Sequence, residues 1–245
     1  ERIERIASWI ELPSALLDLD AGDTTIGHVD STGKAPWGYM QDVADTEAGV
    51  LFIGTTGLVT LHNRTRGYGS SAAVDVSVSA EVIDPGVRLS SGIAGVVNDI
   101  TVSRPGGATV RVVDSVSVST YGVLGEAIDT IGDSDLDALN RANWELATRS
   151  TPVVKLPELT LDGLTEPASA ADVRALDIGS RIEVTDLPAQ APESIADLRV
   201  QGYTERIGAG GWTVTANTTP YLAVTSLILD DPVRGLLDSG NVLAY

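Results

Sequence analysis

The chain has 245 residues, a formal net charge of −18 and no cysteine, and 43% of its residues are hydrophobic. This length and composition suit one large or two modest globular domains, and the acidic balance argues against specific nucleic-acid binding and against docking on an anionic membrane. The absence of cysteine excludes disulfides, thiolate zinc sites and thiol nucleophiles. The sequence contains no apolar run of about 18 residues, so no membrane-spanning helix is predicted.

The first segment, Glu1–Glu11, predicts an amphipathic helix, which Pro13 ends because proline cannot continue it. The apolar side chains that share one face of this helix are Ile3, Ile6 and Ile10. The mixed segment Leu16–Asp30 predicts two short strands around a turn at Ala21-Gly22-Asp23.

The rest of the chain is organised around the stretch Val43–Arg64, which predicts a helix that leads into a tight hairpin. The helix runs from Trp37 to about Ala48, with Gly49 as its expected C-cap. The hairpin consists of strand Val50–Ile53, turn Gly54–Gly57 and return strand Leu58–Asn63. Phe52, the one phenylalanine of the chain, is predicted to anchor the core, and Arg64–Ser71 to form a surface loop.

From Ala73 the sequence is typical of β structure. Valines at 74, 76 and 78 alternate with polar residues and predict a half-buried strand, and Asp84-Pro85-Gly86 predicts a turn. Segments Val96–Arg104 and Thr109–Val113 predict a hairpin. A capped helix is expected over Ser134–Arg149, with a repeating face made of Leu136, Leu139, Asn143, Leu146 and Ala147.

Pro152 marks a change to a nearly all-β pattern, interrupted by one short helix at about Ala170–Leu176. The expected strands are Val153–Leu161, Arg181–Thr185, Leu198–Ile207, Trp212–Asn217 and Leu222–Leu229. Short strands with turn signals predict a small antiparallel barrel or sandwich. The fold class is therefore α+β, with a mixed α/β domain over 1–150 and a β-barrel domain over 151–245.

Two groups of aspartates are candidates for calcium sites. Asp18, Asp20 and Asp23 lack further oxygen ligands at EF-hand spacing. The second group, Asp133, Asp135 and Asp137, is followed by Ala138 and Trp144 where an EF-hand needs glycine and glutamate. Helix capping suits the second group better, because carboxylates are favoured at a helix N-terminus. We expect no metal site.

His28 and His62 are the only histidines, and neither lies in a G-x-S-x-G, H-E-x-x-H or P-loop pattern. Paired carboxylates for glycoside hydrolysis remain open, because folding brings such pairs together. Few aromatic residues are left to stack on sugars, since Trp9, Trp37, Trp144 and Trp212 mostly lie in apolar patterns. We predict no catalytic residue, no cofactor-binding residue and no cofactor; the chain is expected not to be an enzyme.

Three segments carry a resemblance. They are Glu1–Pro13 (ERIERIASWIELP), Val43–Arg64 (VADTEAGVLFIGTTGLVTLHNR) and Val97–Gly122, which has the pattern N-D-hydrophobic-T-V … D-x-x-S … Y-G. Together they resemble the minor tail proteins of long-tailed (siphovirus) actinobacteriophages, of the tail hub or baseplate hub family. This resemblance implies a mixed α/β domain followed by a β-barrel, assembled as a homotrimer at the tail tip of the virion.

The resemblance also implies partners among other tail proteins: the distal tail or tube, the tape measure and the tip proteins. The family's first barrel would lie upstream of Glu1, and we expect the chain to be part of a longer polypeptide. An acidic lumen would suit DNA passage, because like charges do not adhere. The alternatives are a carbohydrate- or receptor-binding module, and a cell-wall hydrolase with an unidentified site.

The C-terminal segment after Pro232 is apolar, where a terminus is usually polar. Its apolar residues are Leu236, Leu237, Val242, Leu243 and Tyr245. It is expected either to fold back as a last barrel strand or to contact another subunit. In the second case, deleting Gly235–Tyr245 would impair assembly more than it lowers Tm.

Overall fold

The computed structural model describes residues 1–30, 32–66, 72, 74–78, 89–90, 92–153, 155–164, 167–187, 189, 191 and 194–221. The expected turn at 84–86, the expected strand 222–229 and the apolar segment after Pro232 lie outside these residues. The chain divides into two compact units, of which the first contains 1–66 and 95–151, and the second contains 67–94 and 152–243.

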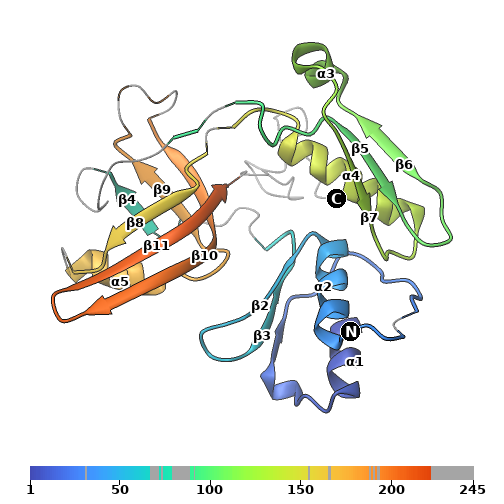
Figure 1. Ribbon diagram of the computed structural model, residues 1–245, viewed down its shortest axis with the longest axis horizontal. Coiled ribbons are helices and arrows are strands. Elements are labelled where there is room, and N and C mark those ends of the chain that lie inside the picture. Colours follow the sequence, from blue (N-terminus) through green and yellow to red (C-terminus); the bar gives the residue numbers. More distant parts are fainter. Residues whose placement is uncertain are drawn as a thin grey trace, which may run out of the picture. The chain divides into compact units, whose positions relative to one another are not determined.

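The first half of unit 1 is a three-stranded sheet covered by two helices (Figure 1). Its elements are α1 (Arg2–Trp9), η1 (Ser14–Leu16), β1 (Leu17–Leu19), α2 (Pro36–Glu47), β2 (Val50–Ile53) and β3 (Val59–His62). Strand β3 lies in the middle, parallel to β1 and antiparallel to β2. The helix–hairpin expectation is thus confirmed. Only one of the two strands expected in Leu16–Asp30 forms, and the rest contributes an isolated bridge from Ile26 to Gly132.

Three aromatic residues that were predicted to lie in apolar surroundings are not part of the core of this half. Apolar side chains of α1 and α2 fill it, namely Ile3, Ile6, Ala7, Tyr39, Met40, Val43 and Ala44, with Leu61 of β3. Phe52 is only half-buried, so its predicted role as core anchor is wrong; its ring meets His62 edge-on, with 4.9 Å between centroids. Trp9 and Trp37 are exposed by 60% and 36%, so neither occupies the apolar position that its sequence pattern indicated.

The second half of unit 1 is a three-stranded sheet with α4 on one face. Its elements are β5 (Asp99–Ser103), β6 (Val110–Val113), α3 (Ser115–Tyr121), β7 (Gly125–Asp129) and α4 (Asp135–Arg149). The order is β6-β5-β7, with β6 antiparallel and β7 parallel to β5. The β5–β6 hairpin and the capped helix α4 are confirmed, whereas α3 and β7 were not predicted.

Helix α4 buries only part of the predicted face, because Leu146 lies in the core and Leu136 and Leu139 do not. Leu136 and Leu139 are exposed by 63% and 37%, while Ala138, Ala142 and Leu146 pack on Ile100 and Val102. Small alanines let the helix axis approach the sheet closely, so the alanine stripe, and not Leu136 and Leu139, faces the strands.

Unit 2 is a curled five-stranded sheet of order β4-β9-β10-β11-β8 (Figure 1). Its elements are β4 (Val74–Ser77), β8 (Glu158–Asp162), α5 (Pro167–Ala175), β9 (Arg181–Thr185), β10 (Ala196–Gly208) and β11 (Gly211–Pro220). The half-barrel confirms the α+β class. One pairing departs from an antiparallel barrel, because β4 runs parallel to β9, with Val74 opposite Ile182.

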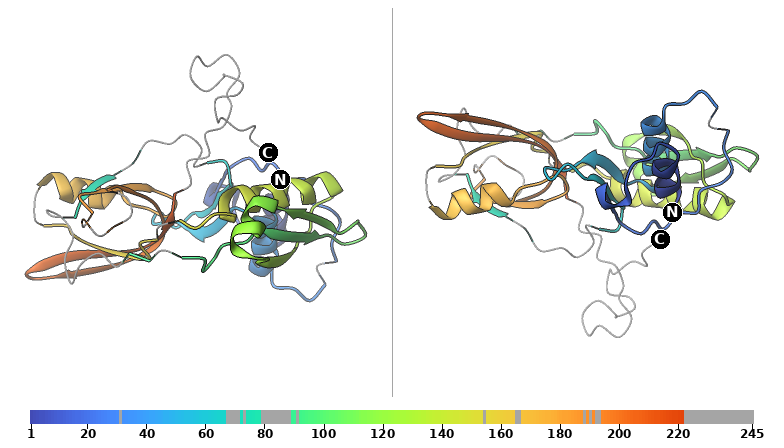
Figure 2. Two further views of the ribbon diagram at one scale, coloured as in Figure 1. Left: turned by 90° about the horizontal axis from the view of Figure 1, so that it is seen from above. Right: turned by 90° about the horizontal axis from the view of Figure 1, so that it is seen from below.

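Helix α5 contacts both edge strands of this sheet, β4 and β8, and Figure 2 shows it beside β4. Its Val173 belongs to the apolar cluster inside the curl, together with Val76, Leu161, Ile182 and Leu198. The two edge strands are thus linked by a helix and not by pairing with each other, as they would be in a closed barrel. Segment 67–94, predicted to belong to the domain over 1–150, is part of unit 2.

Within the described residues, no helix combines the length and the apolar character that a bilayer crossing requires.

Candidate functional site: the end of α2 and the groove beside it

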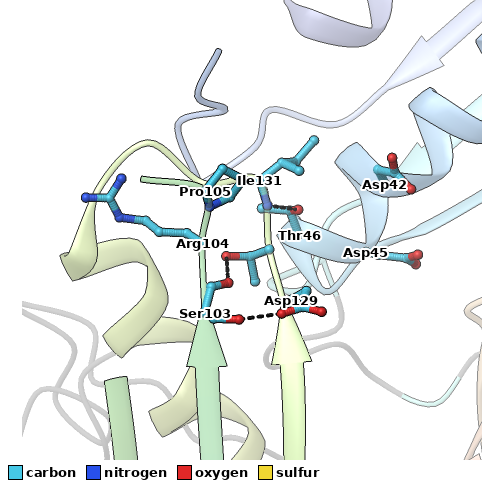
Figure 3. A pocket seen from close by; sticks show the side chains of 9 residues that line it. Asp42, Asp45, Thr46, Ser103, Arg104, Pro105, Asp129 and Ile131 are labelled. Carbon is cyan, nitrogen blue, oxygen red and sulfur yellow. Dashed lines mark hydrogen bonds between the residues drawn. The ribbon is translucent and has the colours of Figure 1, made fainter. Parts of the chain in front are cut away.

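A groove of about 460 Å³ lies in unit 1 between α2, the β5–β6 turn and the residues that follow β7 (Figure 3). Its lining consists of Asp42, Asp45, Thr46, Ser103, Arg104, Pro105, Asp129, Thr130 and Ile131. The groove is concave and has several polar side chains in its walls, as ligand-binding and catalytic sites do.

The polar groups of the groove are largely engaged with one another. Ser103 Oγ donates to Asp129, and the main-chain nitrogen of Thr130 donates to Ser103 O at 2.8 Å. Arg104 extends away from this pair (Figure 3) and its Nε donates to Asp135 Oδ1 at 2.6 Å. That hydrogen bond is the main reason why the pKa of Asp135 lies below its usual value. Ser103 therefore has a carboxylate but no histidine beside it, and the set does not resemble a nucleophile–base pair.

Residues of the Asp45–Gly49 segment, the D-T-E-A-G of the sequence, each make a structural contact. Thr46 is buried and its Oγ1 accepts a hydrogen bond from Ile131 N at 3.1 Å, which joins the two halves of unit 1. Glu47 is 3% exposed, and its carboxylate accepts from the main-chain nitrogens of Asp23 and Thr24 at 3.0 and 2.9 Å. A buried carboxylate thus holds the loop after β1.

The end of α2 corrects one expectation. The C-cap in the left-handed conformation is Ala48, with φ of 55°, and not Gly49. Gly49 is required for another reason: a Cβ at this position would lie 2.6 Å from the carbonyl oxygen of His62. The glycine therefore allows the helix end and β3 to approach one another closely.

A buried ion network connects α2 to α4. Glu145 is 4% exposed and accepts from Arg141 Nη2 at 2.7 Å and from Arg149 Nη1 at 3.1 Å. Arg141 Nη1 also donates to the carbonyl oxygen of Asp45 at 2.6 Å. On its other side Arg149 binds the carboxylate of Glu126, and this pairing raises the pKa of Arg149. Glu145 thus orients two arginines of α4, Glu126 ties the end of α4 to β7, and Arg141 links α4 to the end of α2.

The second motif, beginning at Asn98, also proves to be structural. Asn98 is fully buried; its Nδ2 donates to Ser117 Oγ and to the carbonyl oxygen of Gly122, and its Oδ1 accepts from Leu124 N. Asp114 caps α3 by accepting from the main-chain nitrogens of Val116 and Ser117, a main reason why its pKa is lowered. The motif therefore fixes the path of the chain around α3.

The histidines and aspartates considered as site residues from the sequence do not lie together in one site. His62 lies in β3 against Phe52, whereas His28 is exposed in the loop after Ile26, and neither lines the groove. Asp20 accepts from Asn63 N at 3.1 Å and from Arg66 Nη1 at 2.6 Å.

In the second aspartate group, Asp137 forms a capping box with Ser134, and Asp135 binds Arg104. No cluster of three or more potential metal ligands occurs within the described residues. One residue that the sequence did not single out stands apart: Arg64, assigned to a surface loop, is only 4% exposed, so that assignment is wrong.

No protein-family model matches the chain, and no curated protein matches its sequence. Solved structures do match. The 43 kDa tail protein of prophage MuSo2 from Shewanella oneidensis has a TM-score of 0.54 at 16% identity, over 89% of this chain and 63% of that one. A tail protein from Neisseria meningitidis has a TM-score of 0.60 at 10% identity, over 88% and 65%. The chain has the fold of a phage tail protein.

A third similar chain belongs to the virion of a native gene transfer agent particle, with a TM-score of 0.55 and 13% identity, over 89% of this chain and 46% of that chain. The chain thus spans between about half and two thirds of the length of these proteins. Because all identities are below 25%, the likeness concerns the fold.

Proposed function

We propose that the chain is a structural component of a phage tail tip, a minor tail protein of the baseplate hub type that connects the tail tube to the tip. The observation that carries this proposal is the fold shared with two phage tail proteins over almost nine tenths of the chain. The motif residues of unit 1 support it, because they make structural contacts in place of a reaction centre.

The proposed assembly is a homotrimeric ring in the virion, in contact with tube, tape-measure and tip proteins. The presence of a similar chain in a virion supports such neighbours. We propose two domains, corresponding to 1–150 and 151–245 with segment 67–94 added to the second, and a lumen that part of the acidic surface lines during DNA passage. The net charge of −18 suits such a lumen, because it repels the DNA backbone.

The test is the position and number of copies in the particle. A virion whose chain carries a short peptide tag should bind tag antibody at the tail tip under the electron microscope, and quantitative mass spectrometry should give three copies, or a multiple, per tail. Label along the whole tail would contradict the tip assignment. A phage lacking the chain should accumulate filled heads without complete tails, and normal tails that only fail to adsorb would favour a receptor-binding module.

A further inference from the structure

Strand β10 of unit 2 is much longer than its neighbour β9, so one of its sides is partly open. Strand β11 pairs with β10 as far as the tip of their hairpin (Figure 1). Strand β9 pairs only with 196–199, and the chain just before β9 adds two hydrogen bonds to Val200. Within the described residues, no strand pairs with 202–208 on the side away from β11. The stretch 202–208 is therefore a free edge of the sheet.

The free edge leaves both main-chain groups and apolar surface uncovered. In an antiparallel pair, alternate residues direct their N–H and C=O groups away from the partner, so every second residue of the free edge presents them to the open side. Ile207 lies opposite Trp212, on the same face of the hairpin. Trp212 is 8% exposed, whereas Ile207 is 77% exposed. The apolar face is thus buried on β11 but bare at the end of β10, and one further strand would cover it.

The sequence that follows β11 has the properties of such a strand. Segment 222–229, with the sequence LAVTSLIL, is predicted to be a strand and lies outside the described residues. It contains no charged residue, and its Val224, Thr225 and Ile228 are β-branched, which favours a strand. Pro232 follows shortly after it, and proline does not continue a central strand. Its length also matches that of the free edge, 202–208.

Within one copy, this segment cannot reach far along the free edge. Tyr221 N donates to Asp197 O at 2.8 Å, so the chain leaves β11 on the β11 side of β10. The free edge lies on the other side of β10, two strand spacings or roughly 10 Å away. It starts at 202, which is roughly 16 Å farther along the strand than Asp197. An extended chain needs about six residues to cover both distances, so too little of 222–229 remains to pair.

We propose that segment 222–229 of a second copy of this chain pairs as a strand with the free edge of β10. The inference rests on the proposed homo-oligomer. In a closed ring, each copy gives one strand to a neighbour and receives one from the other neighbour. Strand addition uses main-chain hydrogen bonds for affinity. Because the added segment is uncharged, the contact brings no further negative charge to copies that each carry −18.

The strand pairing is tested by disulfide cross-linking, for which the cysteine-free chain is well suited. One preparation carries Thr204→Cys in the free edge, and a series of others carries a single cysteine at each position of 223–228. After mixing and oxidation, mixed disulfides should form best with one position and less with positions two residues away, because side chains alternate between the faces of a strand. Asn217→Cys is the matched control. Asn217 is exposed, but its strand is paired on both sides, so it should give only the mixed disulfides of random collision.

The cross-links also identify the copy that supplies the strand. A chain that carries both Thr204→Cys and the best partner cysteine should give disulfide-linked oligomers. An internal disulfide at monomer mass would overturn the second copy as the source. Mixed disulfides without the alternation, or in equal amount for Asn217→Cys, would overturn the strand pairing.

The contribution of the strand to assembly is measured by sedimentation over a range of concentrations. Alternate residues face the partner strand, so one of Thr225→Pro and Ser226→Pro removes an N–H that takes part in the pairing. That variant should weaken self-association by about tenfold, the scale of one main-chain hydrogen bond, whereas Thr225→Ala and Ser226→Ala should leave it nearly unchanged. If the natural chain associates and neither proline variant weakens it, the strand addition is wrong and the homo-oligomer stands. A natural chain that stays monomeric throughout would contradict the proposed homo-oligomer itself.

Discussion

Asn98 Nδ2 donates a hydrogen bond of 3.1 Å to Ser117 Oγ, and both side chains are buried although 19 positions separate them. Ser117 Oγ in turn donates to the carbonyl oxygen of Ser150 at 2.6 Å, just after α4. The start of β5, the middle of α3 and the end of α4 are thus joined through one amide and one hydroxyl. Such a network stabilises only when every member is satisfied.

Replacing Asn98 with alanine should therefore be strongly destabilising. It removes the hydrogen bonds of Asn98 to Ser117 Oγ, Gly122 O and Leu124 N. At about 1 kcal/mol net for each hydrogen bond, the free energy of unfolding should fall by about 3 kcal/mol. Ser119→Ala is the control, because this exposed hydroxyl only bonds within α3, and should change stability by less than about 0.5 kcal/mol. Equal urea midpoints for the two variants would contradict the role of Asn98.

Replacing two glycines of the α2 region with alanine should change the free energy of unfolding in opposite directions. Gly49→Ala places a Cβ 2.6 Å from the main-chain oxygen of His62, and the required backbone shift should cost about 2 kcal/mol. Gly38 lies inside α2, and its nearest neighbour to an added Cβ is the flexible end of Lys34 at 3.7 Å. Gly38→Ala should stabilise by about 0.5–1 kcal/mol through helix propensity. Thermal unfolding should give a lower Tm for Gly49→Ala and a higher Tm for Gly38→Ala than for the natural chain.

Glu145→Ala should be strongly destabilising, because the Glu145 carboxylate binds both Arg141 and Arg149. Its removal leaves the largely enclosed Arg141 without its acid partner, which typically costs about 3–5 kcal/mol. Adding Arg141→Met to Glu145→Ala should recover part of this loss, because the unpaired charge is then also removed. Additive losses in the double variant, measured by chemical denaturation, would show that the two side chains do not act as a pair.

The pair Asp99–Arg111 predicts a pH effect at the acidic end. Hydrogen bonds from Arg111 Nε and Nη2, at 2.7 and 2.6 Å, hold the pKa of Asp99 below its usual value of 3.8. A lowered pKa means that the stabilisation is present above pH 3.8 and is lost as pH falls through the lowered value. Arg111→Met should raise the pKa of the Asp99 carboxyl, measured by NMR, back toward its usual value. Arg206→Met, in strand β10 of unit 2, should leave the pKa of Asp99 unchanged.

The sequence predicted elements that carry local signals and missed those set by distant contacts. The α4 capping box and the glycine-rich β2–β3 turn were readable because caps and turns are local chemistry. Helix α3 was missed because its sequence SVSVSTY alternates like a strand; the Asp114 cap and the bonds of Asn98 to Ser117 and Gly122 override this pattern.

The same distinction explains the errors around the candidate site. Phe52 was expected inside because of its hydrophobicity, but β2 is an edge strand and the core is filled from α1 and α2. Arg64 was expected outside because of its charge, and no local pattern indicates a buried guanidinium. Both positions depend on which surfaces cover β3, and this information resides in residues far away along the chain.

The parallel pairing of β4 with β9 has a consequence for how the chain is made. Ser77 donates to Asp186, 109 positions later. At a synthesis rate of about 5–20 residues per second, the strand waits roughly 5–20 seconds for its partner to leave the ribosome. Val74 and Val76, which end almost completely buried, must remain uncovered during that time or be held by a chaperone. The half-barrel can close only after β9 has emerged, whereas the β2–β3 hairpin can form as soon as it emerges.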